Sequence, residues 1–181
     1  MKKSTILAAV ASVVLASAAN AGTIKVEGET QLNNDERTSA KVEIWDGKGP
    51  IGVGLEFKQY LSETGNQAYS NIVGKVGYAL PTVYGFKPVL KAEAGVQAKA
   101  TNDAFYGVVA ELHRPVGPFK AEVAYRYRHN ISSDYATEKR GSVGLQYDLN
   151  KKTEVGVTYH NYFKDTAKDT NAVALSMTRK F

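Results

Sequence analysis

The chain contains no cysteine and only 5 prolines among its 181 residues. A disulfide framework is therefore excluded, and so is a lipid anchor on an N-terminal cysteine. No apolar stretch after residue 21 approaches the ~20 residues that a membrane-spanning helix needs. Tyrosine and glycine are instead abundant, at 11 and 16 residues. This composition favours twisted β-strands joined by short turns, within a single domain.

The first 21 residues have the three parts of a secretory signal peptide. Lys2 and Lys3 form a short basic region, residues 6–18 are apolar and uncharged, and residues 19–21 read Ala-Asn-Ala, a cleavage pattern of small residues. We therefore predict a signal peptide at 1–21 and a mature domain at 22–181. Removal of two of the 23 basic residues, against 18 acidic ones, lowers the formal net charge from +5 to +3. Such a modest charge argues against a nucleic-acid partner.

From residue 23 onward, apolar and polar side chains alternate with a period of two, which is typical of strands with one apolar and one polar face. Tight turns rich in glycine, proline or asparagine alternate with looser polar connections, as in an up-and-down meander. The pattern predicts ten strands, with eight or twelve as the alternatives. The ten segments are 23–32, 38–45, 51–60, 72–80, 90–97, 106–113, 119–128, 142–149, 154–160 and 173–181.

Alternating strands occur both in soluble β-sandwiches and in transmembrane barrels, where the apolar face meets lipid and the polar face lines the lumen. The barrel is favoured because the polar faces carry many glycines, which weaken a solvated strand but fit a crowded interior. Aromatic residues near the segment ends would form the girdles at the two bilayer interfaces. These residues are Phe57, Tyr78, Phe119, Tyr127, Tyr147, Phe163 and Phe181.

The last segment ends in Phe181, with Met177, Leu175 and Val173 at alternate positions before it. It resembles the last strand of outer-membrane β-barrel proteins, in which this pattern is read by the barrel-assembly machinery. Arg179 departs from the pattern, and its long side chain can reach toward lipid headgroups. We predict an all-β, antiparallel up-and-down transmembrane barrel in the outer membrane of a Gram-negative cell. Its expected partners are outer-membrane lipid and the assembly machinery.

The predicted lumen is rich in charge of both signs. One interpretation is a cross-strand ion-pair network that closes the barrel. The other is a narrow aqueous path, with volume left by the small residues and with basic clusters that favour anions. We select Arg126 and Arg128 first, because arginine pairs bidentately with carboxylates; Glu111, Glu122 and their neighbours are the expected internal partners. The other candidate lumen residues are Lys58, Lys75, Lys91, Lys120, Glu56 and Glu93.

The run from Tyr125 to Tyr159 contains YRYRHN, then GLQYDLN and VGVTYHNY. It resembles the last strands of the small oligogalacturonate-specific porins, which are monomeric barrels with a basic lumen. The resemblance implies twelve strands and the uptake of acidic sugars. The sequence as a whole predicts a narrow porin-like channel for small, anionic solutes, and the resemblance implies that these are acidic sugars.

Two other functions stay open. Some small outer-membrane barrels are enzymes, and His129, Asp103, Asp134 and Asp165 lie where a site at the outer rim would form. No nucleophile motif, phosphate loop or metal-ligand spacing surrounds them, so we predict no enzyme, no cofactor and no metal. His113 and His160 are expected to be members of the lumen network. A structural or adhesive barrel is the third possibility, and a measurement of conductance separates it from a channel.

Overall fold

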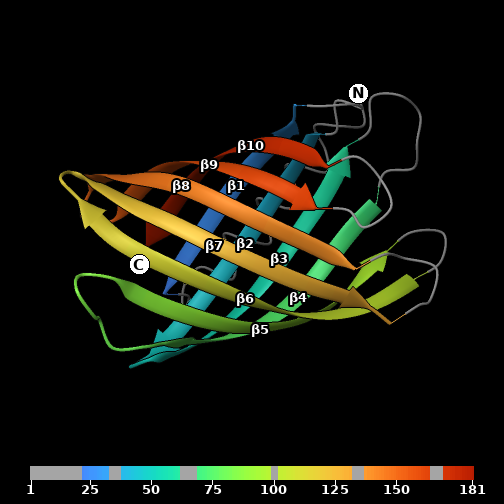
Figure 1. Cartoon of the computed structure of the whole chain (residues 1–181), viewed down its shortest axis with the longest axis horizontal. Coiled ribbons are helices and arrows are strands. Elements are labelled where there is room, and N and C mark those ends of the chain that lie inside the picture. The colour runs from blue at the N-terminus through green and yellow to red at the C-terminus, as the bar shows by residue number, and fades with distance from the viewer. Residues whose placement is uncertain (1–21, 33–37, 62–68, 99–101, 132–136, 164–168) are drawn as a thin grey trace.

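A computed structural model shows ten antiparallel strands joined edge to edge in a closed barrel (Figure 1). The structure describes residues 22–32, 38–61, 69–98, 102–131, 137–163 and 169–181. Each strand pairs with the next along the chain, and β1 pairs with β10 to close the ring. The strands are β1 (Thr23–Gln31), β2 (Thr38–Lys48), β3 (Ile51–Leu61), β4 (Tyr69–Ala79), β5 (Lys87–Ala98), β6 (Asn102–Val116), β7 (Phe119–Asn130), β8 (Glu138–Asn150), β9 (Thr153–Phe163) and β10 (Thr170–Lys180).

The prediction of ten strands in an up-and-down barrel is confirmed, and the twelve strands implied by the porin resemblance are wrong. Several predicted segments are too short, at both ends of the barrel; on the turn side, for example, β2 ends at 48 rather than 45. β6 begins at 102 rather than 106, and β8 at 138 rather than 142, because the alternation continues through residues that look like polar loop in sequence. No helix in the described part of the chain is both long and apolar enough to span a membrane.

The two ends of the barrel differ in their connections. The turns after β2, β4, β6 and β8 lie together at one end, here called the turn side, on the left of Figure 1. The other end, where the chain leaves β1, β3, β5, β7 and β9, is called the loop side. The turn after β4 is closed by two hydrogen bonds between Val83 and Phe86 and has positive φ at both Tyr84 (51°) and Gly85 (79°). That conformation is the tight hairpin turn whose twist matches the flanking strands.

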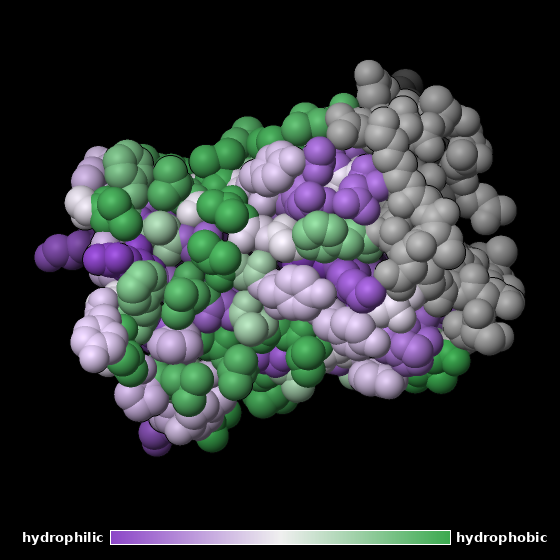
Figure 2. Space-filling model, in the orientation of Figure 1, coloured by the Kyte–Doolittle hydropathy of each residue, from purple (hydrophilic) through white to green (hydrophobic). Residues whose placement is uncertain are grey.

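Apolar side chains cover the outside of the barrel and charged side chains fill the inside. Val53 and Val108 on the outer wall are 55% and 58% exposed, whereas Glu93 and Arg126 inside are each only 4% exposed. Figure 2 shows apolar side chains spread over the wall, with polar ones gathered toward its ends. This distribution is the reverse of a soluble protein and suits a wall in contact with lipid, so the soluble-sandwich alternative is wrong.

The predicted girdle residues all lie on the outer face. Phe119 and Tyr147 are adjacent across β7 and β8, with ring centroids 5.6 Å apart. Four further aromatic residues, which the sequence interpretation did not assign to a face, point into the lumen instead. These are Trp45, Tyr60, Phe105 and Tyr162.

Candidate functional site

The lumen contains two cavities, one toward each end of the barrel. The turn-side cavity has a volume of about 620 Å³, and the loop-side cavity has a volume of about 260 Å³. All ten candidate residues point inward. The turn-side cavity is lined by Lys75, Lys91, Glu56, Glu93, Glu111, Glu122 and Arg126, and the loop-side cavity by Arg128. Lys58 lies between the cavities, and Lys120 is near the turn-side rim.

Lysine–glutamate pairs line the turn-side cavity. The Lys75 ammonium lies 2.7 Å from Glu43 and 2.6 Å from Glu56, so it joins β2, β3 and β4. Lys91 lies 2.5 Å from Glu111. At the rim, Lys120 pairs with Glu154 and, at 2.9 Å, with Asp148; Glu122 accepts a hydrogen bond from the amide of Gln146 at 2.9 Å. These residues therefore form the predicted cross-strand network.

A buried cluster around Glu29 lies on the β1, β3 and β9 side of the lumen, near its middle. Lys58 donates to the Glu29 carboxylate at 3.1 Å, and the Tyr162 hydroxyl donates to both of its oxygens at 2.9 and 3.0 Å. The Lys58 ammonium also lies 4.7 Å from the centre of the Tyr60 ring. Strands β1, β3 and β9 thus meet across the lumen.

Arg126 and Arg128 pair with carboxylates other than those predicted. Arg128 donates from Nε to Glu93 Oε1 at 2.9 Å, and its guanidinium lies 4.0 Å from the centre of the Phe105 ring. Arg126 donates to Glu138. The predicted partners, Glu111 and Glu122, are instead paired on the turn side, so that expectation is wrong. The Arg128–Glu93 pair depends on the residue that lies between the two strands, Gly107.

Gly107 on β6 separates Arg128 on β7 from Glu93 on β5. It is the cross-strand partner of both residues. A Cβ atom at Gly107 would lie only 3.1 Å from Glu93 Oε1 and 3.2 Å from the Arg128 Cα atom. The arginine therefore reaches over a bare backbone to a carboxylate two strands away, and the glycine makes that ion pair possible.

Arg140 is a lumen residue that the sequence interpretation missed. It lines the turn-side cavity and lies directly opposite Arg126 in the pairing of β7 with β8. It makes no ion pair with a carboxylate of the described residues, and its guanidinium lies 5.8 Å from the centre of the Tyr162 ring. The signal was available, because Glu138 and Arg140 continue the inward positions of β8 back from Ser142. Both precede the predicted segment 142–149.

Trp45 occupies space that the glycines were expected to leave for water. It continues the inward positions of β2, and its indole donates to Glu43 at 2.8 Å. A Cβ at Gly54 would lie 2.8 Å from the indole, and one at Gly52 or Gly77 would lie 3.3 Å from it. The hollow above these three glycines is therefore filled by an aromatic ring, and the free volume of the turn-side cavity lies beyond it.

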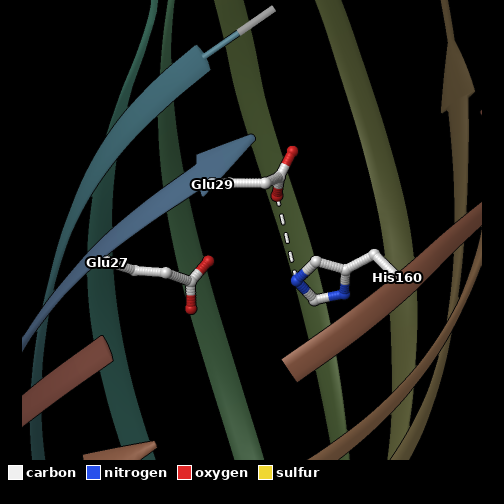
Figure 3. A group of neighbouring side chains, drawn as sticks. All are labelled: Glu27, Glu29 and His160. Atoms are coloured by element: carbon white, nitrogen blue, oxygen red, sulfur yellow. Dashed lines mark ion pairs between the residues drawn. The ribbon is translucent and has the colours of Figure 1, made fainter. Parts of the chain in front are cut away.

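Glu27, Glu29 and His160 form a buried group whose donor atoms lie within 4.8 Å of one another (Figure 3). Their chemistry suits a metal ion, but their surroundings do not. Lys41 lies 2.7 Å from Glu27, and Lys58 lies 3.1 Å from Glu29, so both carboxylates are already neutralised by lysines. His160 lies 3.8 Å from Glu29 and hydrogen bonds through Nδ1 to Ser142 at 2.8 Å. We therefore assign the group to the ion-pair network, as expected for His160.

His129 and Asp103, the two described residues among those proposed for an enzymatic rim site, lie on opposite faces of the barrel wall. His129 is exposed on the outer face of β7 beside Tyr106, with ring centroids 5.4 Å apart. Asp103 is buried on the inner face of β6. Asp134 and Asp165 lie outside the described residues. His113 joins the turn-side network, 3.1 Å from Glu111.

A closed barrel with an apolar wall and a charged lumen is the fold of outer-membrane β-barrel proteins. Among solved structures, the chain is similar to the NanC porin, with a TM-score of 0.61 and 9% identity over 87% of this chain and 100% of that one. The KdgM porin gives a TM-score of 0.55 and 13% identity over 88% of this chain and 99% of that one. KdgM in complex with disordered oligogalacturonate gives 0.53 and 10%, with the same two coverages.

These likenesses confirm, at the level of the fold, the resemblance to small porins noted in the last strands. No protein-family model and no curated protein sequence matches the chain. At such low identities the comparison identifies the architecture, and the solute must be argued from the lumen itself.

Proposed function

We propose that the protein is a narrow porin-like channel of the outer membrane for small anionic solutes. The observation that carries the proposal is the direct opposition of Arg126 and Arg140 at the wall of the turn-side cavity. Like charges placed directly opposite each other destabilise a sheet, so their retention calls for a gain elsewhere. An anion bound between the two arginines would offset the repulsion, because guanidinium groups match the geometry of carboxylates and phosphates.

The surrounding lumen supports this assignment. Arg140 makes no ion pair in the described part of the chain, and Glu29 and Glu138 act on its charge only from a longer distance. Lysines on the turn side form ion pairs with glutamates, so they contribute less positive potential to the cavity. The structure of the KdgM porin, whose fold the chain shares, has been solved in complex with disordered oligogalacturonate, which is an acidic sugar. We extend that solute class to this chain, together with the predicted signal peptide and outer-membrane location.

Liposome swelling tests the proposal with three solutes of matched size: glucuronate, glucose and glucosamine. We expect the anionic sugar to enter fastest and the cationic sugar slowest. Arg126→Ala combined with Arg140→Ala should abolish this order. The matched control is Arg179→Ala, because Arg179 is exposed on the outer face of β10. Swelling that ignores solute charge would contradict the anion preference.

A non-conducting barrel is the second candidate, and one observation favours it. The Glu29 cluster and two further ion pairs lie near the middle of the lumen. If these contacts never open, the barrel is a closed structural or adhesive element. Absence of swelling with all three solutes would support that function.

A further inference from the structure

Two ion pairs separate the turn-side cavity from the loop-side cavity. Arg126 and Glu93 line the turn-side cavity, whereas Arg128 and Glu138 line the loop-side cavity. Each pair, Arg126–Glu138 and Arg128–Glu93, therefore has one member in the wall of each cavity. Among the described residues, none lines both cavities. These four residues are called the mid-lumen barrier.

Both ion pairs of the barrier are only half made. Arg128 contacts Glu93 through Nε and Oε1, while Arg128 Nη2 and Glu93 Oε2 are buried with no hydrogen-bond partner in the described part of the chain. Arg126 contacts Glu138 through Nη2, and its Nε is likewise buried and unpartnered. Arginine and carboxylate commonly form two parallel hydrogen bonds. Here each arginine keeps a donor unused.

Unused donors in a buried site point to a ligand that accepts hydrogen bonds. A buried N–H group without a partner costs free energy, and an oxygen of a carboxylate or phosphate would remove that cost. Arg140 Nε, on the turn side of the barrier, is a third buried donor without a hydrogen-bond partner among the described residues. An oxyanion moving from the loop side would meet Arg128 first and then Arg126 and Arg140.

We propose that Glu93 and Glu138 determine the specificity of the channel, because an oxyanion solute must displace them from Arg128 and Arg126 to pass. The inference rests on the proposed function. The solute first takes the unused donor of an arginine and then replaces its glutamate. The released carboxylate turns aside, and the two cavities join. A neutral or cationic solute offers no acceptor charge to the arginines and leaves the barrier closed.

Binding of inorganic phosphate to the purified protein in detergent micelles tests the proposal without any measurement of transport. In the variant Glu93→Gln with Glu138→Gln, the internal competitors lose their charge. The apparent affinity for phosphate, measured by titration calorimetry, should rise at least about tenfold, as expected when a charge-assisted hydrogen bond no longer has to be broken. The matched control is Glu122→Gln with Glu154→Gln, which removes the same charge from the turn-side cavity without touching an arginine pair. Its affinity should change by no more than about twofold, because screening weakens distant charges.

Two results would overturn the proposal: phosphate affinity that stays level or falls in the barrier variant, or an equal rise in the control. If the double variant does not fold, Glu138→Gln alone makes the same test, because the Glu138 side chain is 31% exposed and tolerates the change. A wild-type protein that passes no solute would contradict the proposed function. The calorimetric result would still decide whether the glutamates compete with an oxyanion.

Discussion

Arg126 on β7 and Arg140 on β8 are direct cross-strand partners, and both line the turn-side cavity of the lumen. Only Arg126 has a carboxylate partner, Glu138, among the described residues. A sheet that places two guanidinium groups side by side concentrates positive charge at the cavity wall, at a cost in like-charge repulsion. The pair therefore links the fold to the proposed anion preference.

The first prediction concerns this trade between stability and selectivity. Arg140→Gln removes the like-charge contact and should raise the free energy of unfolding by about 0.5–1 kcal/mol, the scale of one cross-strand pair. Anion preference should fall in the same variant. Urea titration of the protein in lipid vesicles measures the stability, and Arg140→Lys, which keeps the charge, is the control. A loss of stability in Arg140→Gln would mean that Arg140 is a structural residue.

The second prediction concerns the indole of Trp45. Gly54→Ala would place a Cβ 2.8 Å from the ring, so the variant should be destabilised by about 1–3 kcal/mol through overpacking. Gly28→Ala is the matched control, because nothing lies within 4 Å of a Cβ there. Trp45 is the one tryptophan of the chain, so its emission reports the displaced ring directly. Equal stability of the two variants would contradict the close packing of the Trp45 indole against Gly54.

Which side chains of β7 and β8 point into the lumen could be predicted from the sequence. A period of two places Tyr125 and Tyr127 toward lipid and Arg126 and Arg128 inside, and the structure confirms all four positions. The same parity, extended beyond the predicted segment, would also have placed Arg140 inside. Whether a side chain points into the lumen or outward is thus a local property, because the pleat of the backbone sets it.

The ion-pair partners could not be predicted in the same way. Glu93 is 35 residues from Arg128 in sequence, and the two meet because Gly107 lets a long side chain cross an intervening strand. The meeting depends on the stagger of three strands and on the reach of an arginine. Likewise, the indole of Trp45 on β2 lies over glycines of β3 and β4, which it meets only in the folded sheet. Neither relationship has a periodic signature in the chain.

The third prediction tests the Glu29 cluster. Lys58→Met leaves the buried Glu29 without its counter-charge and should cost about 3 kcal/mol of stability. Adding Glu29→Gln should recover part of that loss, with a coupling of about 1–3 kcal/mol in the double-mutant cycle. At the rim, the Lys120 side chain is 38% exposed, so Lys120→Met should cost less than about 1 kcal/mol. Additive effects of the two buried changes would contradict a direct pair.

The fourth prediction concerns metal ions. Lysines already neutralise Glu27 and Glu29, so neither Zn²⁺ nor a chelator should shift the urea midpoint of the protein. The double variant Lys41→Met with Lys58→Met removes these lysines and should make the group responsive to Zn²⁺, provided that the variant folds. Stabilisation of the unaltered protein by Zn²⁺ would contradict the assignment to the ion-pair network.

The most direct test of the proposed function is the reversal potential of the unaltered protein in a planar bilayer that separates two concentrations of KCl. Charge in the lumen decides which ion carries the current. With Arg126 and Arg140 facing the turn-side cavity, we expect discrete conducting steps and a reversal potential displaced toward that of chloride. A reversal potential displaced toward that of potassium, or a bilayer without conducting steps, would contradict an anion-selective channel.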